Sequence, residues 1–346
     1  MAFKLVSNPP NPWQHASVEW LGEPPEAKLE IYEENAQTIL SENKSPDLGF
    51  RWSLNPYRGC FHACAYCYAR PSHQYWDFGA GTDFERKLIV KVNAPAVLEQ
   101  TFRKKSWRGE SIVFSGNTDC YQPLEAAYRL TRRCLDVCLT FRNPVSLITK
   151  GPLIQRDAAV LAGLTQKARC FVTMSIAFAD DKMARAIEPG APLPSARFSA
   201  MKTLHEAGVP VGVGVAPVIP GLNDSQLAEI LERAHASGAR SAFMTPLRLP
   251  AEVKPVFFER LETVFPERVE KVRNAILEMR GGQLNRGNFH ERFIGQGERW
   301  TMVERLFDVT CRRLGLNADE ESSRETVKHS PFRRPGETMS LFAQEQ

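Results

Sequence analysis

The chain has 346 residues, with 44 Lys and Arg against 40 Asp and Glu, which gives a formal net charge of +4. This near balance excludes a strongly basic or acidic protein, so any binding of nucleic acid has to come from local patches. No stretch reaches the apolar length of a membrane span, and the first ten residues lack the apolar core of a signal peptide. We therefore expect a cytoplasmic protein with no membrane partner.

The chain divides by composition into four segments. Residues 1–49 are rich in Pro, Glu, Asn and Ser and predict an irregular arm. From residue 50 to 280, apolar runs alternate with helical patterns that end at glycine, which is typical of a parallel sheet built from βα units. Residues 281–316 predict a helical extension, with a helix at about 298–314 that packs on the core. Residues 317–346 have the composition of a disordered tail.

Six short buried strands are predicted in the 50–280 segment. They are expected at about 52–55, 111–115, 145–149, 170–176, 209–215 and 241–245. Amphipathic helices are expected from about 195 to 208 and from about 223 to 238. The segment is therefore predicted to be an α/β domain in which strands and helices alternate.

Three cysteines follow the first predicted strand in the spacing C-x3-C-x2-C: Cys60, Cys64 and Cys67. Soft thiolates bind zinc, copper(I) or iron–sulfur clusters. A structural zinc ion requires a fourth ligand, for which His62 or His73 is available, but no second Cys or His pair stands at the usual spacing. A disulfide would leave one of the three cysteines unpaired. A cubane held by three cysteines leaves one iron open for a cofactor, and this interpretation is favoured.

The cysteine loop, with Tyr66 just before the last cysteine, resembles the radical S-adenosylmethionine (SAM) superfamily. Further runs resemble its uncharacterised "DNA repair photolyase-like" branch, which is related to spore photoproduct lyase; they lie at 55–60, 66–70, 81–85, 118–123 and 215–224. The resemblance implies a partial (β/α)6 TIM-like barrel. It also implies one [4Fe-4S] cluster bound by the three cysteines, SAM on the open iron, and a reductant such as flavodoxin or ferredoxin. Reductive cleavage of SAM would give a 5′-deoxyadenosyl radical.

The turn after the second strand is the first candidate SAM site, because reactive groups of such barrels lie at the carboxyl ends of strands. Gly116, Asn117, Thr118 and Asp119 stand where family members carry a glycine-rich stretch that ends in an acid and holds the amino group of SAM. An ammonium group requires acceptors, which Thr118 and Asp119 supply. The alternative is an ordinary turn that caps the next helix.

Later strand ends supply the other candidates for SAM. The resemblance places Ser175 near the ribose and Arg197 near the carboxylate of SAM, against the alternatives of capping and surface roles. Val215 and Ala216 are candidates to offer backbone groups to the adenine edge. Tyr66 is a candidate to lie against the adenine, with exclusion of water from the cluster as the alternative.

Two residues are candidates for catalysis. The related lyase uses a cysteine as hydrogen-atom donor near the end of its second strand, where this chain has Gly116 or Asn117. Cys120 is a nearby thiol and a candidate donor, and Tyr121 is a candidate to face the substrate. The alternative for Cys120 is a small packing residue at a helix start, as expected also for the remaining cysteines. Repair of spore photoproduct itself is therefore not predicted.

The tail carries an apolar group near its end, formed by Met339, Leu341 and Phe342. It resembles the bacterial sliding-clamp-binding peptide; the alternative is that it folds back on the protein. We expect a radical SAM enzyme that removes hydrogen from a substrate, with DNA base repair or modification as the leading hypothesis. A peptide or metabolite substrate, and a non-catalytic iron–sulfur module recruited by its tail, remain alternatives.

Overall fold

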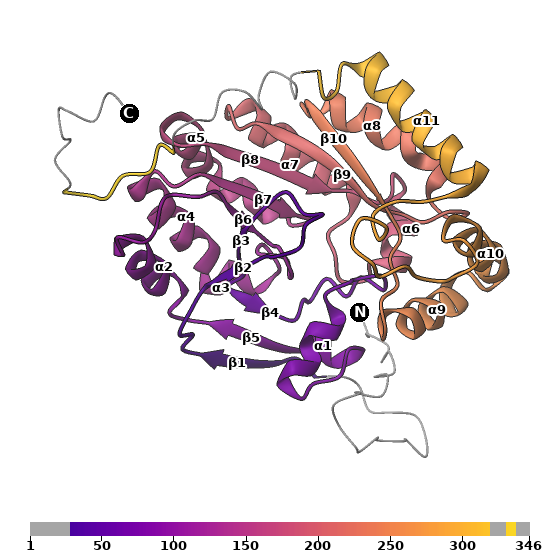
Figure 1. Ribbon diagram of the computed structural model, residues 1–346, viewed down its shortest axis with the longest axis horizontal. Helices are drawn as coiled ribbons and strands as arrows, with labels where there is room; N and C mark the ends of the chain where they lie inside the picture. Colours follow the sequence, from indigo (N-terminus) through magenta and orange to yellow (C-terminus); the bar gives the residue numbers. More distant parts are fainter. Residues whose placement is uncertain (1–27, 319–329, 337–346) are drawn as a thin grey trace.

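The computed structural model describes residues 28–318 and 330–336 (Figure 1). Its main element is a seven-stranded sheet in the order β10-β9-β8-β7-β6-β3-β2. The strands are β2 (Leu40–Glu42), β3 (Trp52–Leu54), β6 (Ile112–Phe114), β7 (Val145–Thr149), β8 (Cys170–Ser175), β9 (Val211–Val218) and β10 (Ser241–Pro246). All neighbours pair in parallel except β2, which is antiparallel to β3 at one edge. The six parallel strands are the six predicted ones, which confirms the partial barrel.

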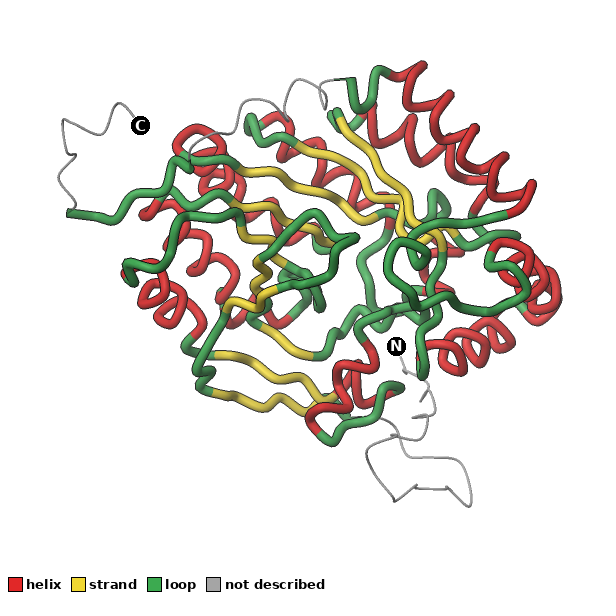
Figure 2. Tube along the Cα trace, viewed as in Figure 1, coloured by secondary structure: helices red, strands yellow, loops and turns green. Residues whose placement is uncertain are grey.

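Helices such as α5, α7 and α8 cover the outer face of this curved sheet, as Figure 2 shows, whereas α1 lies at the second sheet. The helices of the described residues are α1 (Thr82–Arg86), α2 (Ala94–Arg103), α3 (Leu124–Tyr128), α4 (Leu130–Phe141), α5 (Ala158–Lys167), α6 (Asp181–Ile187), α7 (Pro194–Glu206), α8 (Leu227–Ala236), α9 (Val253–Val264), α10 (Val269–Met279) and α11 (Gly297–Leu314). Short 3-10 helices lie at η1 (Arg70–Trp76), η2 (Pro152–Asp157), η3 (Asp224–Gln226) and η4 (Pro266–Arg268). The helices expected near 195–208 and 223–238 are α7 and η3 with α8.

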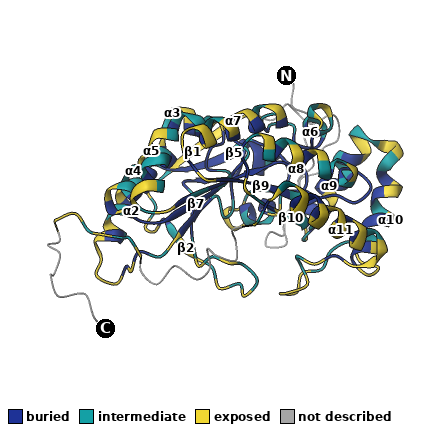
Figure 3. Cartoon of the chain, turned by 90° about the horizontal axis from the view of Figure 1, so that it is seen from above, coloured by how far each residue is buried: buried dark blue, intermediate teal, exposed yellow. Residues whose placement is uncertain are grey.

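The two faces of the sheet differ because side chains alternate along a strand. Leu147, Val172 and Val213 are fully buried beneath the helices, whereas Ser146 and Ile148 are half-buried on the opposite, inner face. Figure 3 shows burial concentrated in the strands and in the helix faces that meet them. The inner face is thus the less covered side of the partial barrel.

A second, three-stranded sheet was not predicted. Its order is β1-β5-β4, with β1 at Glu30–Glu34, β5 at Lys87–Lys91 and β4 at Tyr57–Arg58. The strands β1 and β2 both lie within the arm that was expected to be irregular, so this expectation is corrected for residues 30–34 and 40–42. The side chains of β1 are mostly exposed, so it carries no apolar pattern; its position comes from parallel backbone pairing with β5.

The C-terminal region packs on the domain. The helix expected at 298–314 is α11, whose Trp300 and Phe307 are buried and which packs on α8 and α10. Part of the expected disordered tail also packs: Phe332 meets the rings of Phe102 and Phe141, at 5.6 and 6.1 Å between centroids. Arg334 adds hydrogen bonds to the carbonyl oxygens of Phe102, Lys104 and Trp107, so a few specific contacts hold this segment and composition alone could not indicate them. Met339, Leu341 and Phe342 lie outside the described residues.

No helix in the described ranges is both long and apolar enough to cross a membrane.

Candidate functional site

The cysteine loop begins directly after β4. Gly59 has φ +70°, and a Cβ there would lie 2.7 Å from Leu88 Cδ2 and 2.9 Å from the Phe84 carbonyl oxygen, so glycine is required. The Cys60 N–H donates to that same carbonyl oxygen at 2.9 Å. Within the loop, the Cys67 N–H donates to the Cys64 carbonyl oxygen at 3.2 Å. The loop is therefore fixed by the helix α1 and by its own turns.

The three thiols of the loop are free; Cys60 and Cys64 are buried and Cys67 is half-buried. Burial raises the pKa of each thiol, to about 12 for Cys64, and the negative charge of Cys67 adds to the rise for both of the others. Three neighbouring thiols with raised pKa values can all lose their protons only when a positive charge, such as bound iron, compensates the negative charges of the thiolates. The donor set fits a cluster whose cysteines each bind a different iron.

In the described ranges, no three His, Cys, Asp or Glu side chains are placed to hold one metal ion.

Asp119 lies at the centre of a hydrogen-bond network that includes the cysteine loop. Its carboxylate accepts from Thr149 Oγ1 at 2.6 Å, from the Lys150 N–H at 2.7 Å and from the Tyr121 N–H at 2.8 Å. His62 Nδ1 is 3.4 Å away. Burial acts to raise the pKa of Asp119, but the charge and hydrogen bond of His62 act in the opposite direction and the net pKa is lowered. The carboxylate thus joins three strand-end segments; its predicted contact with SAM stays a prediction.

The rest of the predicted SAM turn lies against the cysteine loop. The Gly116 carbonyl oxygen accepts a hydrogen bond from the Tyr68 hydroxyl at 3.0 Å. Thr118 is buried and its Oγ1 donates to the Tyr57 carbonyl oxygen at 2.6 Å, while Asn117 between them is half-buried. The structure therefore brings this turn and the cysteines together, although they are about fifty residues apart in sequence.

Arg197 is fully buried and forms an ion pair with Glu188, a residue that sequence reasoning missed. Its guanidinium also donates to the Ser175 carbonyl oxygen at 3.0 Å, and the Tyr66 hydroxyl donates to the second oxygen of Glu188. Burial opposes ionisation of Glu188, but the charges of Arg197 and Lys150 lower its pKa overall. Tyr66, Ser175 and Arg197 therefore lie together around Glu188, which compensates the charge of Arg197, and their predicted contacts with SAM stay predictions.

Lys150 is a second cation beside the loop. Its ammonium lies 5.6 Å from the centroid of the Tyr66 ring. Within the described ranges no carboxylate oxygen lies within 4.0 Å of it, so it has no ion pair there. Burial acts to lower the pKa of Lys150, but the negative charges of Cys64 and Glu188 raise it overall. Lys150 therefore stays positively charged and available to an anionic group.

The two candidate catalytic side chains lie in the protein interior. Cys120 is 1% exposed and Tyr121 is 2% exposed, and both belong to the main hydrophobic core. The Tyr121 hydroxyl donates to Asp157 at 3.1 Å, and the Cys120 N–H donates to Ser115 Oγ at 2.8 Å. These positions match the packing role that the sequence left open for Cys120; a catalytic role for either residue stays a prediction.

Val215 and Ala216 point to opposite faces of β9. Val215 is buried among the core residues, whereas Ala216 is half-buried. Gly214, two residues before Ala216, lies on the inner face, because a Cβ there would be 2.7 Å from the ring of Phe243 on β10. Of the two candidates, only the side chain of Ala216 therefore lies on the inner face.

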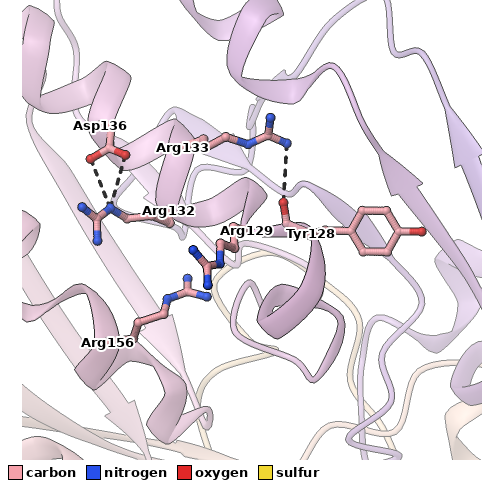
Figure 4. A pocket seen from close by; sticks show the side chains of 6 residues that line it. All are labelled: Tyr128, Arg129, Arg132, Arg133, Asp136 and Arg156. Atoms are coloured by element: carbon pink, nitrogen blue, oxygen red, sulfur yellow. Dashed lines mark hydrogen bonds and ion pairs between the residues drawn. The ribbon is translucent and has the colours of Figure 1, made fainter.

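The described residues line a cavity on the inner face of the sheet and another between helices. One, of about 380 Å³, lies on the inner face and is lined by Gly49, Phe50, Arg51, Glu110, Ser111, Val113, Ser146, Ile148, Phe171 and Thr173. The other, of about 650 Å³, is lined by residues of α3, α4 and η2: Tyr128, Arg129, Arg132, Arg133, Asp136 and Arg156 (Figure 4). There Arg132 binds Asp136 and Asp157, and Arg156 binds Asp157 and Glu125, so half of the arginines are paired.

Comparison with known proteins establishes the family. Residues 54–234 match the Radical SAM superfamily, which is more than half of the chain, and the chain belongs to this superfamily. An uncharacterised protein of Mycobacterium tuberculosis is 39% identical over 236 residues, which cover 67% of this chain and 69% of that protein. A radical SAM Nalpha-GlyT isomerase of Pseudomonas phage M6 is 22% identical over 230 residues, 66% of this chain and 46% of the isomerase.

The fold is shared with a solved enzyme. Spore photoproduct lyase, solved with bound AdoMet and dinucleoside spore photoproduct, superposes with a TM-score of 0.58 at 14% identity, over 83% of this chain and 80% of the lyase. Members of the superfamily use a [4Fe-4S] cluster and SAM, and they need a reductant. The family, the fold and the two cofactors predicted from the cysteine loop are thereby confirmed.

Proposed function

We propose that Cys60, Cys64 and Cys67 bind a [4Fe-4S] cluster and that the chain removes a hydrogen atom from a nucleic-acid base, in a repair or modification reaction. When bound, the cluster supplies the electron that cleaves SAM to methionine and a 5′-deoxyadenosyl radical. The observation that carries this proposal is the loop of three free thiols at the carboxyl end of β3, in contact with the ends of neighbouring strands. Reactive groups of parallel barrels are built at this end.

The surrounding residues are proposed to bind and orient SAM. The turn from Gly116 to Asp119 receives its amino group, with Asp119 holding the turn against the cysteine loop. Lys150 is our candidate for the carboxylate of SAM, because the guanidinium of Arg197 is already paired with Glu188. Arg197 then acts as a positioning residue that fixes Glu188.

Other parts of SAM are assigned to strand ends that the sequence singled out. Ser175, at the end of β8, is proposed to contact the ribose. The backbone of Val215 and Ala216 on β9 is proposed to contact the adenine edge. Tyr66 lies beneath Lys150 with its hydroxyl held by Glu188, so its ring shields the loop from water. Hydrogen donation by Cys120 and a substrate-facing position for Tyr121 stay predictions.

The proposed nucleic-acid substrate is supported by the solved lyase of the same fold, which was bound to a dinucleoside spore photoproduct. Recruitment to DNA by the sliding clamp through Met339, Leu341 and Phe342 stays a prediction from the sequence.

Transfer of deuterium tests the proposed reaction. Protein reconstituted without oxygen is supplied with SAM, a reductant and single-stranded DNA deuterated in its bases, and 5′-deoxyadenosine is analysed by mass spectrometry. We expect deuterium in 5′-deoxyadenosine, because the radical abstracts hydrogen from the substrate. Deuterium arriving only from a labelled peptide or metabolite mixture would reject the nucleic-acid substrate. No SAM consumption at all would favour a non-catalytic module.

A further inference from the structure

Arg248 follows β10 and has no carboxylate partner among the described residues. It lies two residues beyond the end of β10 and is half-buried. Its guanidinium carbon is 4.8 Å from the centroid of the Phe293 ring. Its Nε is buried and has no hydrogen-bond partner among the described residues, and no carboxylate of those residues lies within 4.0 Å. A buried donor without an acceptor costs free energy, so its position requires an explanation.

Neighbouring arginines do have partners. Arg292 contacts the same ring of Phe293, at 5.0 Å, and forms an ion pair with Asp47. Arg280 has no carboxylate partner among the described residues and its Nε is also unpaired there, but its other nitrogens donate to three backbone carbonyl oxygens, at 2.6, 2.9 and 3.5 Å. Arg248, in contrast, makes no hydrogen bond to the described residues, and the ring of Phe293 holds its guanidinium in place.

The position of Arg248 relates it to the cysteine loop. The Tyr68 hydroxyl, on the residue after Cys67, donates to the Gly116 carbonyl oxygen at 3.0 Å, two residues beyond the end of β6. Lys150 follows β7 and Arg248 follows β10, with β8 and β9 between these strands. Both cations therefore follow parallel strands at the same carboxyl end of the sheet at which Tyr68 contacts the turn after β6. Since SAM has a single carboxylate, for which Lys150 is proposed, Arg248 is left for an anionic group of the substrate.

Three aromatic rings are exposed on the cysteine loop, on β10 and on the segment after α10. Tyr68 is 53% exposed, and Phe289, whose ring lies 5.0 Å from the Arg292 guanidinium, is 54% exposed. Phe243 on the inner face of β10 is 40% exposed, and its ring lies over Gly214. Single-stranded nucleic acids bind where cations contact phosphates and aromatic rings stack on bases. An arginine fork in particular matches the geometry of a phosphate group.

We propose that Arg248 binds a phosphate of a single-stranded nucleic-acid substrate and thereby positions the adjoining nucleotide beside Tyr68. The inference deepens the proposed function and rests on it, because phosphate binding here serves a base that must reach the cysteine loop. The cavity in Figure 4 offers a different arrangement: Arg132 and Arg156 are paired with carboxylates, Arg133 donates to the Tyr128 carbonyl oxygen at 3.5 Å, and no arginine there lies over an aromatic ring of the described residues.

Equilibrium binding of a fluorescent single-stranded oligodeoxynucleotide to the reconstituted protein, with SAM present, tests the assignment. We expect Arg248→Gln to weaken binding about tenfold or more, because a charge-assisted hydrogen bond is lost. The slope of log K against log salt should also become shallower, by the amount expected for the loss of about one phosphate contact. Arg248→Lys keeps the charge but not the fork, so it should retain the salt dependence and lose part of the affinity. Arg133→Gln removes an equal charge from the exposed cavity of Figure 4 and should leave affinity within about twofold.

Each other result overturns the assignment. Unchanged affinity in Arg248→Gln, an equal loss in Arg133→Gln, or no binding by the wild type would do so. An equal loss of SAM affinity in Arg248→Gln would place Arg248 in the SAM site instead, and binding of an acidic peptide in place of DNA would reject the phosphate. If Arg248→Gln fails to fold, the affinity of Arg248→Lys for the oligodeoxynucleotide decides the question. Failure of the proposed function has a separate readout, which is absence of SAM cleavage by the wild type.

Discussion

Glu188 illustrates how single residues organise the site. This buried carboxylate receives the Tyr66 hydroxyl and the Arg197 guanidinium on different oxygens, and it lowers the cost of burying both. It follows the end of α6, and no motif in the sequence indicates it. The one available signal is indirect: an arginine predicted at the start of α7 near an active site requires a carboxylate if it is buried.

Replacing Glu188 tests this arrangement. Glu188→Gln keeps the size of the side chain but leaves the charge of Arg197 buried and uncompensated, so we expect a loss of about 3 to 5 kcal/mol in the free energy of unfolding. Denaturant unfolding measures it. The control is Glu232→Gln, whose partner Arg313 is exposed, and which should lose less than about 1 kcal/mol. Equal, small losses in both variants would contradict the buried pair.

Among the helices, strands and loops, the features that could be predicted were those set by residues close together in the sequence. Each parallel strand is a short apolar run because helices cover its outer face, so β3 and β6 to β10 could be located within a few residues. The cysteine spacing is equally local, since one loop supplies all three thiols. The sheet formed by β1, β5 and β4 depends on backbone pairing between distant segments, and the exposed side chains of β1 give no pattern for it.

The contact between the cysteine loop and the segment at the end of α6 also joins parts of the chain that are distant in sequence. The Gly190 N–H donates to the His62 carbonyl oxygen at 3.1 Å, and the Ala65 N–H donates to the Ile187 carbonyl oxygen at 3.0 Å. A Cβ at Gly190 would lie 2.1 Å from the Phe61 carbonyl oxygen, which is backbone and cannot rotate away. Only glycine therefore allows the two segments to lie this close.

Gly190→Ala should separate these segments. We expect the variant to lose most of its iron during anaerobic gel filtration, because the loop that presents the thiols is displaced. Gly287→Ala is the matched control: a Cβ there meets nothing within 4 Å, and iron content should be unchanged. Iron and sulfide are measured per chain. Full retention of iron by Gly190→Ala would show that the contact does not hold the loop.

For the molecule as a whole, the family and the cofactors followed from one loop, but the environment of that loop did not. Lys150 and Glu188 come from the ends of two different segments, and only the fold brings them to Tyr66. Asp119 was predicted as a SAM ligand from its position, whereas its carboxylate accepts donors from its own chain. Hydrogen bonds between strand ends cannot be inferred from residue types alone.

Cleavage of SAM tests the central claim most directly. Wild-type protein, reconstituted without oxygen to about four irons and four sulfides per chain, should convert SAM to 5′-deoxyadenosine and methionine when a strong reductant is added. Cys64→Ala should form no 5′-deoxyadenosine, because one iron of the cluster loses its ligand. Cys134→Ala changes a buried cysteine on α4, outside the loop, and should retain the activity. Cleavage of SAM by Cys64→Ala at the wild-type rate, or none by wild-type protein with a complete cluster, would contradict the account.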